Sequence, residues 1–384
     1  LTGSHYLDGD HACSEGAIAA GCRFASGYPI TPSTEVMQIL ARELPRYGGV
    51  LLQAEDEISG VGAAVGASFA GKKSMTATSG PGMSLKTEML GLASIAELPL
   101  VLLNVQRGGP STGIPTKPEQ ADLFQAAFSA HGDVLRPVLA PTSVEDTFRI
   151  TVEAFNLAER YQTPVVILSD QEIAQRKETV DPIDVSRFEL FERLRPTPEE
   201  LSGGYQRFAA TPSGVSPLSH PGMEGGNYLA AGIEHDVKGA PTASGAVHAA
   251  MNEKRFRKLA PLQDRPDLFE HMGPPDAPLA LVSWGSSAGV AREAFLLAQA
   301  RGLLVKLLVP SLIYPVAEPI YRGFFASVRA GLVLELSHQG QLYRVLRMFV
   351  DVPHGVTSFA RSGAQPFRAD EVLERLAQQA EALR

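Results

Sequence analysis

Four residues have the types and surroundings that chemistry requires: Thr31, Glu57, Arg107 and Thr116. Glu57 stands directly ahead of a run of small residues at 58–67, and a carboxylate in such a place can act as a general acid or base. Arg107 follows an apolar run and precedes two glycines, so its guanidinium can offer two parallel donors to a carboxylate. Thr31 and Thr116 carry small hydroxyls on turns that proline stiffens. Together these residues predict a coenzyme pocket.

Each of these residues has a plainer explanation when it is taken singly. Acidic residues favour a helix N-terminus, and we assign that role to Glu55 and Asp56 but not to Glu57. Arg107 alone would be a surface arginine, and threonines such as Thr31 on proline turns are usually turn residues or caps. The case for a site therefore depends on their convergence.

Convergence is what the surrounding loops predict. Four loops each follow a predicted strand: 28–35, 53–57, 79–82 and 106–116. In a parallel sheet such loops meet at one edge, beyond the carboxyl ends of the strands, and open α/β sheets bind their ligands there. Four converging loops rich in Gly, Pro and Thr are better support for a site than any one of them.

Two local details of this edge can be predicted. Gly62 and Gly66 lie four residues apart in a helix, where each glycine costs about 1 kcal/mol relative to alanine. We expect a second backbone or a flat ligand to approach that face and offset the cost. In the first loop we expect Ser33 or Thr34 to cap the helix that follows.

Apolar runs and helical patterns alternate along the first half of the chain. We predict strands near residues 22–28, 50–52, 74–78, 100–105 and 165–168, and helices after Thr34, from Glu55, after Gly82 and over 144–161. This alternation indicates a parallel sheet covered on both faces.

The pattern changes twice in the second half. Residues 196–275 are polar and rich in Pro and Gly, and we expect an excursion or linker without regular elements. A smaller α/β block follows, with strands predicted near 279–284, 303–309 and 331–336 and helices near 288–301, 317–327, after Gln339 and over 369–384. The predicted domains are residues 1–235 with the excursion, a linker at 236–275, and 276–384.

Composition limits the class of protein. The chain has 384 residues, of which 44% are hydrophobic and 20% charged, which suits a globular protein of two domains. A net charge of -8 argues against a nucleic-acid partner, and no apolar run is long enough to span a membrane. The two cysteines, Cys13 and Cys22, supply neither an iron–sulfur cluster nor a disulfide framework, so we expect a reducing cytoplasm. The first residue is not methionine, from which we expect a processed or excised chain.

Several motifs resemble the alpha subunits of 2-oxoacid:ferredoxin oxidoreductases, and the 2-oxoglutarate enzymes are the most similar. The motifs are Tyr28-Pro29-Ile30-Thr31-Pro32-Ser33-Thr34-Glu35, the Glu57 helix, Thr78-Ser79-Gly80-Pro81-Gly82, the 106–113 loop, Glu234-His235-Asp236 with Lys254-Arg255, and residues 334–342. The resemblance implies a pyrimidine-type thiamine diphosphate-binding domain, followed by an α/β domain of the transketolase C-terminal type. It also implies decarboxylation of a 2-oxo acid, transfer of electrons to ferredoxin and transfer of the acyl group to coenzyme A.

The same resemblance implies roles for individual residues. Glu57 matches the glutamate that hydrogen-bonds the aminopyrimidine ring, and Arg107 matches the residue that holds the substrate carboxylate. Thr31 and Thr116 match further positions that hold the substrate, and the position of Thr31 is near the reacting centre. Cofactor contacts are expected from Tyr28, Pro29, Ile30, Glu57 and Gly80.

The resemblance also implies partners, because the chain has neither a Gly-Asp-Gly motif for diphosphate and magnesium nor cluster cysteines. A beta subunit is expected to supply Mg²⁺ and the [4Fe-4S] cluster, in an (alpha-beta)2 heterotetramer, with a gamma domain possible upstream. Two alternatives stay open. The substrate could be pyruvate or a branched-chain or aryl 2-oxo acid, or the chain could be a noncatalytic structural subunit.

Overall fold

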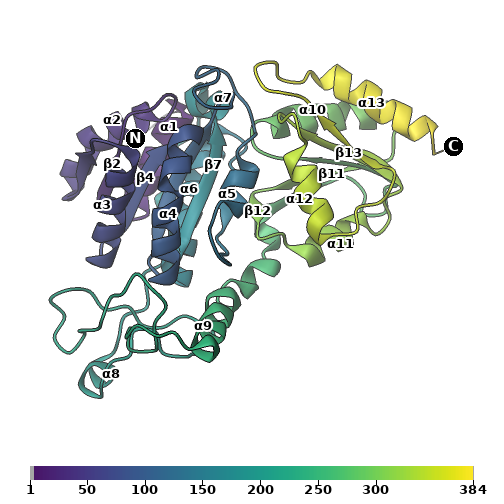
Figure 1. Cartoon of the computed structure of the whole chain (residues 1–384). Coiled ribbons are helices and arrows are strands. Elements are labelled where there is room, and N and C mark those ends of the chain that lie inside the picture. The colour runs from purple at the N-terminus through teal and green to yellow at the C-terminus, as the bar shows by residue number, and fades with distance from the viewer. Residues whose placement is uncertain (1–3, 384) are drawn as a thin grey trace.

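The structure is a computed structural model that describes residues 4–383, and it contains two α/β blocks side by side (Figure 1). The purple-to-blue block is built on a seven-stranded sheet and the green-to-yellow block on a five-stranded sheet. Between them in the sequence, residues 181–244 are mostly irregular: residues 188–191 run along α6 (Val144–Tyr161), and the later part of the segment lies below the first sheet (Figure 1). The α/β class predicted from the sequence is confirmed.

The first sheet has the strand order β12-β6-β7-β5-β4-β2-β3, and the pairs from β6 to β3 are parallel. Its strands are β2 (Phe24–Gly27), β3 (Val50–Gln53), β4 (Ser74–Thr78), β5 (Leu100–Gln106), β6 (Val138–Leu139), β7 (Pro164–Asp170) and β12 (Leu312–Tyr314). The central strands β5 and β7 are buried along their whole length, as expected of parallel strands covered on both faces. The carboxyl ends of β2, β3, β4 and β5 lie along one edge, as the sequence predicted.

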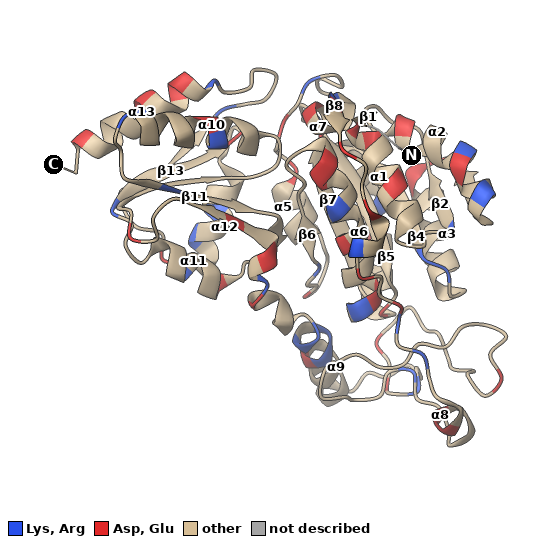
Figure 2. Ribbon diagram, turned by 180° about the vertical axis from the view of Figure 1, so that it is seen from behind, with Lys and Arg blue, Asp and Glu red and all other residues tan. Residues whose placement is uncertain are grey.

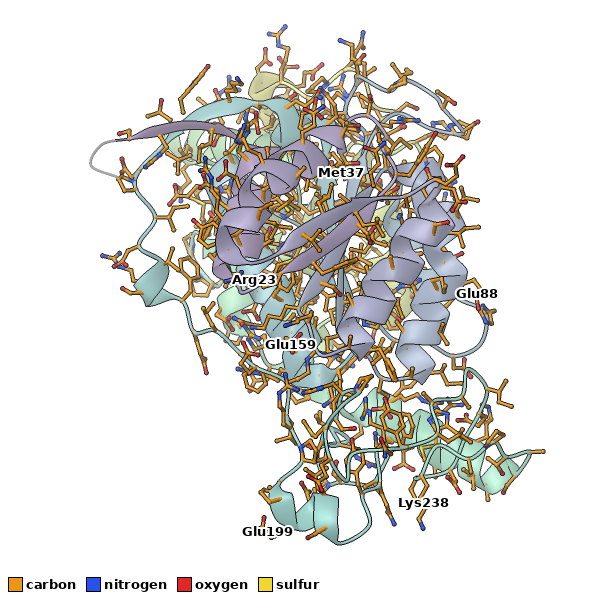
Figure 3. The ribbon with its side chains drawn as sticks, turned by 90° about the vertical axis from the view of Figure 1, so that its left-hand side faces the viewer. Arg23, Met37, Glu88, Glu159, Glu199 and Lys238 are labelled. Atoms are coloured by element: carbon orange, nitrogen blue, oxygen red, sulfur yellow. The ribbon has the colours of Figure 1, made fainter. Side chains whose placement is uncertain are left out.

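Helices cover both faces of this sheet. One layer holds α1 (Gly9–Ala19), α2 (Thr34–Glu43) and α6 (Val144–Tyr161), and the other holds α3 (Glu57–Phe69) and α4 (Gly80–Ile95). Figure 3 shows the two layers from the side, with Met37 marking α2 and Glu88 marking α4. The shorter elements are α5 (Leu123–Phe128), α7 (Gln171–Gln175) and an antiparallel ribbon of β1 (His5–Asp8) and β8 (Lys177–Val180).

The second sheet has the order β14-β13-β10-β11-β9, and only its β9–β11 pair is antiparallel among the described residues. Its elements are β9 (Phe269–Met272), β10 (Leu279–Ser283), α10 (Ser287–Ala300), β11 (Val305–Pro310), α11 (Glu318–Phe325), β13 (Ala330–Glu335), α12 (Gln341–Phe349), β14 (Val356–Ala360) and α13 (Ala369–Glu381). One strand of this half, β12, leaves it and pairs with β6 of the first sheet, with Leu312 opposite Leu139.

The segment over residues 196–275 is less irregular than predicted. It contains the short helix α8 (Pro198–Ser202) and the longer helix α9 (Gly245–Arg257). The prediction missed α9 because the helix is fixed by charge rather than by an apolar stripe: its buried residues are Met251 and Lys254, and Figure 2 shows its basic residues in blue on the ribbon. The same view shows α9 between the excursion and the second block. Within residues 4–383 no helix is both long and apolar enough to cross a membrane.

Candidate active site

The carboxyl ends of β2, β3, β4 and β5 form the edge of the first sheet that we call the active edge. The first loop at this edge turns the chain from β2 into α2. The hydroxyl of Ser33 donates to the carbonyl of Ile30 at 3.0 Å, and the Ser33 amide donates to the same oxygen at 2.9 Å. Ser33 occupies the N-cap position of α2, but its side chain makes no capping bond, so the capping role predicted for it is wrong. The hydroxyl instead closes the turn that carries Thr31, whose peptide bond to Pro32 is cis.

The second loop places Glu57 at the start of α3. Asp56 is extended, and its carboxylate accepts a 2.7 Å hydrogen bond from the amide of Ser59, so it is the N-cap of α3 and lies at the helix N-terminus, as predicted for an acidic residue there. The helix therefore begins at Glu57, two residues after the predicted start at Glu55. Glu57 is only 8% exposed, yet among residues 4–383 no group donates a hydrogen bond to its carboxylate.

A close approach of two backbones fixes α3 on the sheet, but not at the glycines predicted for it. A methyl group on Gly60 would lie 2.9 Å from the α-carbon of Gly27 at the end of β2. At Gly62 it would meet only the end of the Met89 side chain, and at Gly66 it would meet nothing within 4 Å. Gly60 is thus the glycine that the packing requires, while Gly62 and Gly66 belong to an open face of the helix.

The third loop brings the start of α4 against Glu57. A methyl group on Gly82 would lie 2.1 Å from the Thr78 hydroxyl oxygen and 3.0 Å from Oε1 of Glu57. One turn further along α4, the fully buried ammonium of Lys86 donates at 3.1 Å to the main-chain carbonyl of Glu57 and at 3.1 Å to the hydroxyl of Thr76. Glu57 is thus held from α4 through its main chain.

The fourth loop holds Arg107 beside the first. The Arg107 side chain is 7% exposed, and its Nη1 donates at 2.5 Å to the carbonyl of Thr31, so the structure brings these two predicted residues together. Its Nε is buried and has no hydrogen-bond partner among the described residues. Burial lowers the pKa of Arg107, while the nearby Asp122 carboxylate opposes that effect.

Asp122 adds a second carboxyl group to this part of the edge. Its Oδ2 accepts a 3.0 Å hydrogen bond from the Asn104 amide and would lie 3.1 Å from a methyl group on Gly80. Burial raises the pKa of Asp122 to about 6, although the bond from Asn104 acts in the other direction. Gly80, Arg107 and Asp122 line a cleft of about 780 Å³, whose far side is formed by His338 and Gln339 of the second block.

Residues 118–125 connect this cleft to the second block. One carboxylate oxygen of Glu119 accepts from the Gly109 amide and the other from the Gly363 amide, both at 2.9 Å. Gln120 exchanges hydrogen bonds with Trp284, Ser287 and Leu336, and Gln341 does so with Ala121 and Phe124. The second block is therefore bonded to the segment that follows the Arg107 loop.

The other predicted site residues are more open. Tyr28 is 41% exposed, and Thr31 and Thr116 are also exposed, whereas Pro29 and Ile30 are half-buried. Thr116 belongs to a loop closed by hydrogen bonds from Gly108 to Lys117 and from Ile114 to Gly108. Thr116 directly precedes Lys117, whose carbonyl accepts the bond from Gly108. Within the described residues no hydrogen bond joins Thr116 to Glu57 or Arg107.

The motifs at 234–236 and 254–255 lie at the other end of α4 from the active edge. Glu97 lies two residues after the end of α4 and accepts hydrogen bonds of 2.6 Å from Lys254 and 3.1 Å from Lys258, while Arg255 binds Glu234. Burial by itself would raise the pKa of Glu97, but the neighbouring ammonium groups outweigh it and lower the pKa to about 2. This cluster fastens α9 to the first block and stays apart from Glu57.

Three site residues escaped the sequence analysis: Lys86, Glu119 and Asp122. A signal for Lys86 existed, because it falls on the buried stripe of α4 with Met83 and Leu90, at positions i, i+3 and i+7. Glu119 and Asp122 follow an irregular loop, where no periodicity marks which side chains face inward.

The comparisons with known proteins agree with this geometry. A family described as pyruvate flavodoxin/ferredoxin oxidoreductase, thiamine diphosphate-binding, matches residues 15–254. The chain belongs to this family. The predicted resemblance is thereby confirmed, and so is the thiamine diphosphate-binding type of the first block.

Individual relatives cover nearly the whole chain. A 2-oxoglutarate synthase subunit KorA of Methanothermobacter marburgensis is 36% identical over 98% of this chain and 99% of its own length. The 2-oxoglutarate:ferredoxin oxidoreductase of Magnetococcus marinus, solved with 2-oxoglutarate, coenzyme A and succinyl-CoA bound, matches with a TM-score of 0.95 and 40% identity. That match covers 98% of this chain and 65% of the Magnetococcus chain. A split-gene transketolase, 12% identical with a TM-score of 0.57 over 99% of this chain and 100% of its own, shares the fold alone.

Family membership can be tested against the residues present. The aminopyrimidine ring of thiamine diphosphate needs a carboxylate partner, and the Glu57 carboxylate, 8% exposed, receives no hydrogen bond from residues 4–383. The buried Ser79 hydroxyl also has no partner among these residues. These residues fit the aminopyrimidine half of the cofactor.

Proposed function

We propose that this chain is the alpha subunit of a thiamine diphosphate-dependent 2-oxoglutarate:ferredoxin oxidoreductase, which is active together with a beta subunit. The reaction is the oxidative decarboxylation of 2-oxoglutarate with coenzyme A and ferredoxin, or the reverse carboxylation of succinyl-CoA. The observation that carries the proposal is the Glu57 carboxylate, which is buried at the edge of the sheet and has no hydrogen-bond donor among residues 4–383. The names of the relatives, and the ligands in the Magnetococcus structure, support the choice of substrate.

Glu57 is the residue that exchanges a proton with the cofactor. The bound cofactor would supply the carbon nucleophile and the electron sink that loss of carbon dioxide requires. Glu57 hydrogen-bonds the aminopyrimidine ring and holds or releases a proton at its carboxylate. Gly82 lets α4 pack directly against the Glu57 side chain. We assign the remaining cofactor contacts to Gly80, Tyr28, Pro29 and Ile30.

Arg107 and the two threonines bind the 2-oxo acid. Arg107 is fixed at one nitrogen by the Thr31 carbonyl, which leaves its other donors, including the unpartnered Nε, for a carboxylate. The hydroxyl of Thr31 stands on the same turn, near the reacting carbon of the substrate. Thr116, on the exposed loop opposite, completes the substrate contacts.

A beta subunit covers the open side of the site. Leu52 of the edge strand β3, Ile58 of α3 and Leu85 of α4 are each about half exposed. With the open face at Gly62 and Gly66 they form an apolar surface that suits a protein partner. That subunit carries the diphosphate site with Mg²⁺ and the [4Fe-4S] cluster, and the assembly is an (alpha-beta)2 heterotetramer.

The test is an assay of the assembled complex. The chain is purified with its partner, and coenzyme A-dependent reduction of a viologen dye is followed with 2-oxoglutarate, pyruvate, and branched-chain and aryl 2-oxo acids. We expect the highest kcat/KM with 2-oxoglutarate. A preference for another acid would keep the enzyme class and overturn the substrate.

The variant Glu57→Gln addresses catalysis itself. We expect its turnover to fall at least ~10²-fold because proton exchange at the cofactor is lost, while the complex assembles as before. Size-exclusion chromatography of the complex is the control for assembly. Near-normal turnover in this variant would leave the chain a noncatalytic structural subunit.

A further inference from the structure

Lys86 is a buried charge that the proposed chemistry has not used. Its side chain is inaccessible to solvent, in the middle of the apolar stripe by which α4 packs on the sheet. Its ammonium has three donors, and two of them bind the Glu57 carbonyl and the Thr76 hydroxyl. Methionine or leucine would fill this volume without the cost of removing an ammonium from water.

The position of the ammonium relative to Glu57 is specific. Lys86 binds the main chain of Glu57 and forms no ion pair with its carboxylate, which leaves both carboxylate oxygens free for a ligand. Through Thr76, Lys86 also joins the first turn of α3 to the middle of β4. The charged groups that act on it are the carboxylates of Glu57, the first residue of α3, and of Asp56, its N-cap.

We propose that Lys86 is a positioning residue for Glu57, which fixes the first turn of α3 and provides a buried positive charge near the Glu57 carboxylate. This inference rests on the proposed role of Glu57. The charged ammonium makes a stronger hydrogen bond to the Glu57 carbonyl than a neutral group would, so Glu57 is held best while Lys86 is protonated.

The pH range of this effect follows from the surroundings of Lys86. Burial lowers the pKa of Lys86 to about 8, although the carboxylates of Glu57 and Asp56 oppose the decrease. The ammonium is therefore charged below about pH 8 and loses its charge as the pH rises through that value. Turnover should decline over the same range, because the first turn of α3 is then held less firmly.

The experiment compares Lys86→Met with the parent complex, loaded with thiamine diphosphate. We expect kcat to fall about tenfold at pH 7, KM for 2-oxoglutarate to change less than twofold, and the decline above pH 8 to disappear from the kcat profile. We also expect the affinity of the cofactor-free complex for thiamine diphosphate, measured by titration calorimetry, to fall several-fold.

Lys73→Met is the matched control. Lys73 is another buried lysine, and its ammonium donates to the carbonyls of Ala20 and Phe191. It directly precedes β4, at the end of that strand away from the active edge. Its replacement should lower stability but keep the parent pH profile. If Lys86→Met does not assemble, Lys86→Gln keeps a donor without the charge and is expected to lose the same alkaline decline.

The possible outcomes separate the two proposals. If the Lys86 variants keep the kcat and pH profile of the parent while Glu57→Gln is inactive, the inference about Lys86 is wrong and the role of Glu57 stands. If Glu57→Gln is active, the proposed function is wrong, and the inference about Lys86, which rests on it, is wrong as well. A lower thermal midpoint in Lys86→Met with an unchanged pH profile would make Lys86 a purely structural residue.

Discussion

The substitution Gly82→Ala tests the packing around Glu57 with a single methyl group. Gly82 lies in the first turn of α4, where alanine is the better helix former by about 1 kcal/mol. The added carbon would nevertheless lie 2.1 Å from Oγ1 of Thr78, 2.9 Å from Cγ of Glu57 and 3.0 Å from its Oε1. Relief of these contacts requires Glu57 and Thr78 to move.

The magnitudes differ for stability and for activity. Overpacking costs about 1–3 kcal/mol, and the gain in helix propensity offsets about 1 kcal/mol, so the free energy of unfolding should fall by at most about 2 kcal/mol. Activity is more sensitive, because a displacement of about 1 Å in a catalytic group can lower the rate on the order of 10²-fold. We therefore expect a folded complex with turnover reduced about 10²-fold.

The assay combines thermal unfolding with viologen reduction by the complex. The control Gly323→Ala lies in α11, where the methyl group would meet nothing within 4 Å, and it should stabilise the chain without changing turnover. In the double variant Thr78→Ala with Gly82→Ala the shortest contact disappears while the contact with Glu57 remains. Stability should then recover and turnover should not, and full turnover in Gly82→Ala would refute the placement of Glu57.

Two further predictions concern buried charges. Glu97→Gln should lower the free energy of unfolding by about 3–5 kcal/mol, because it leaves Lys254 and Lys258 buried without their carboxylate. The control Glu253→Gln, on the exposed side of α9, should change the thermal midpoint little. Equal effects of the two substitutions would contradict the role of the Glu97 cluster. Asp122→Asn should stabilise the chain by up to about 3 kcal/mol at pH 8 and not at pH 4. Since the folded pKa of Asp122 is raised from 3.8 to about 6, its contribution to stability is fully present below pH 3.8 and lost as the pH rises through 6. Urea unfolding at the two pH values measures this difference. A stabilisation by Asp122→Asn seen only at pH 4 would contradict a raised pKa of Asp122 in the folded chain.

The active edge could be predicted because each strand and the loop that follows it are contiguous in the sequence. Each of β2, β3, β4 and β5 is a short apolar run followed by turn residues, and parallel pairing brings the ends of such runs together. Glu57 could be distinguished from Asp56 for a similar reason, since Asp56 has the residue type of a cap and Glu57 precedes the small residues. The backbone of β2 approaches α3 at Gly60 and not at Gly62 or Gly66. This position could not be predicted, because spacing shows which glycines share a helix face but not which face meets the sheet.

Contacts between distant segments could not be predicted. The strand β12 has only three residues, and nothing in them indicates that it pairs with β6 of the other sheet. The helix α9 is fixed by Lys254 and Lys258 reaching Glu97, a contact that periodicity does not encode. Pairings of this kind depend on loop geometry and on buried charge, which a pattern of apolar residues leaves undetermined.

The exchange of β12 between the two blocks limits how this gene can be divided. A fragment that stopped before residue 276 would lack β12 and leave β6 as an unprotected edge strand beside β7. Free edges of this kind recruit strands from other molecules, so such a fragment would tend to aggregate. Fusions and circular permutations of the chain should therefore keep residues 312–314 attached to the first sheet. A break within the exposed residues 202–204, at the end of α8, would disturb neither sheet.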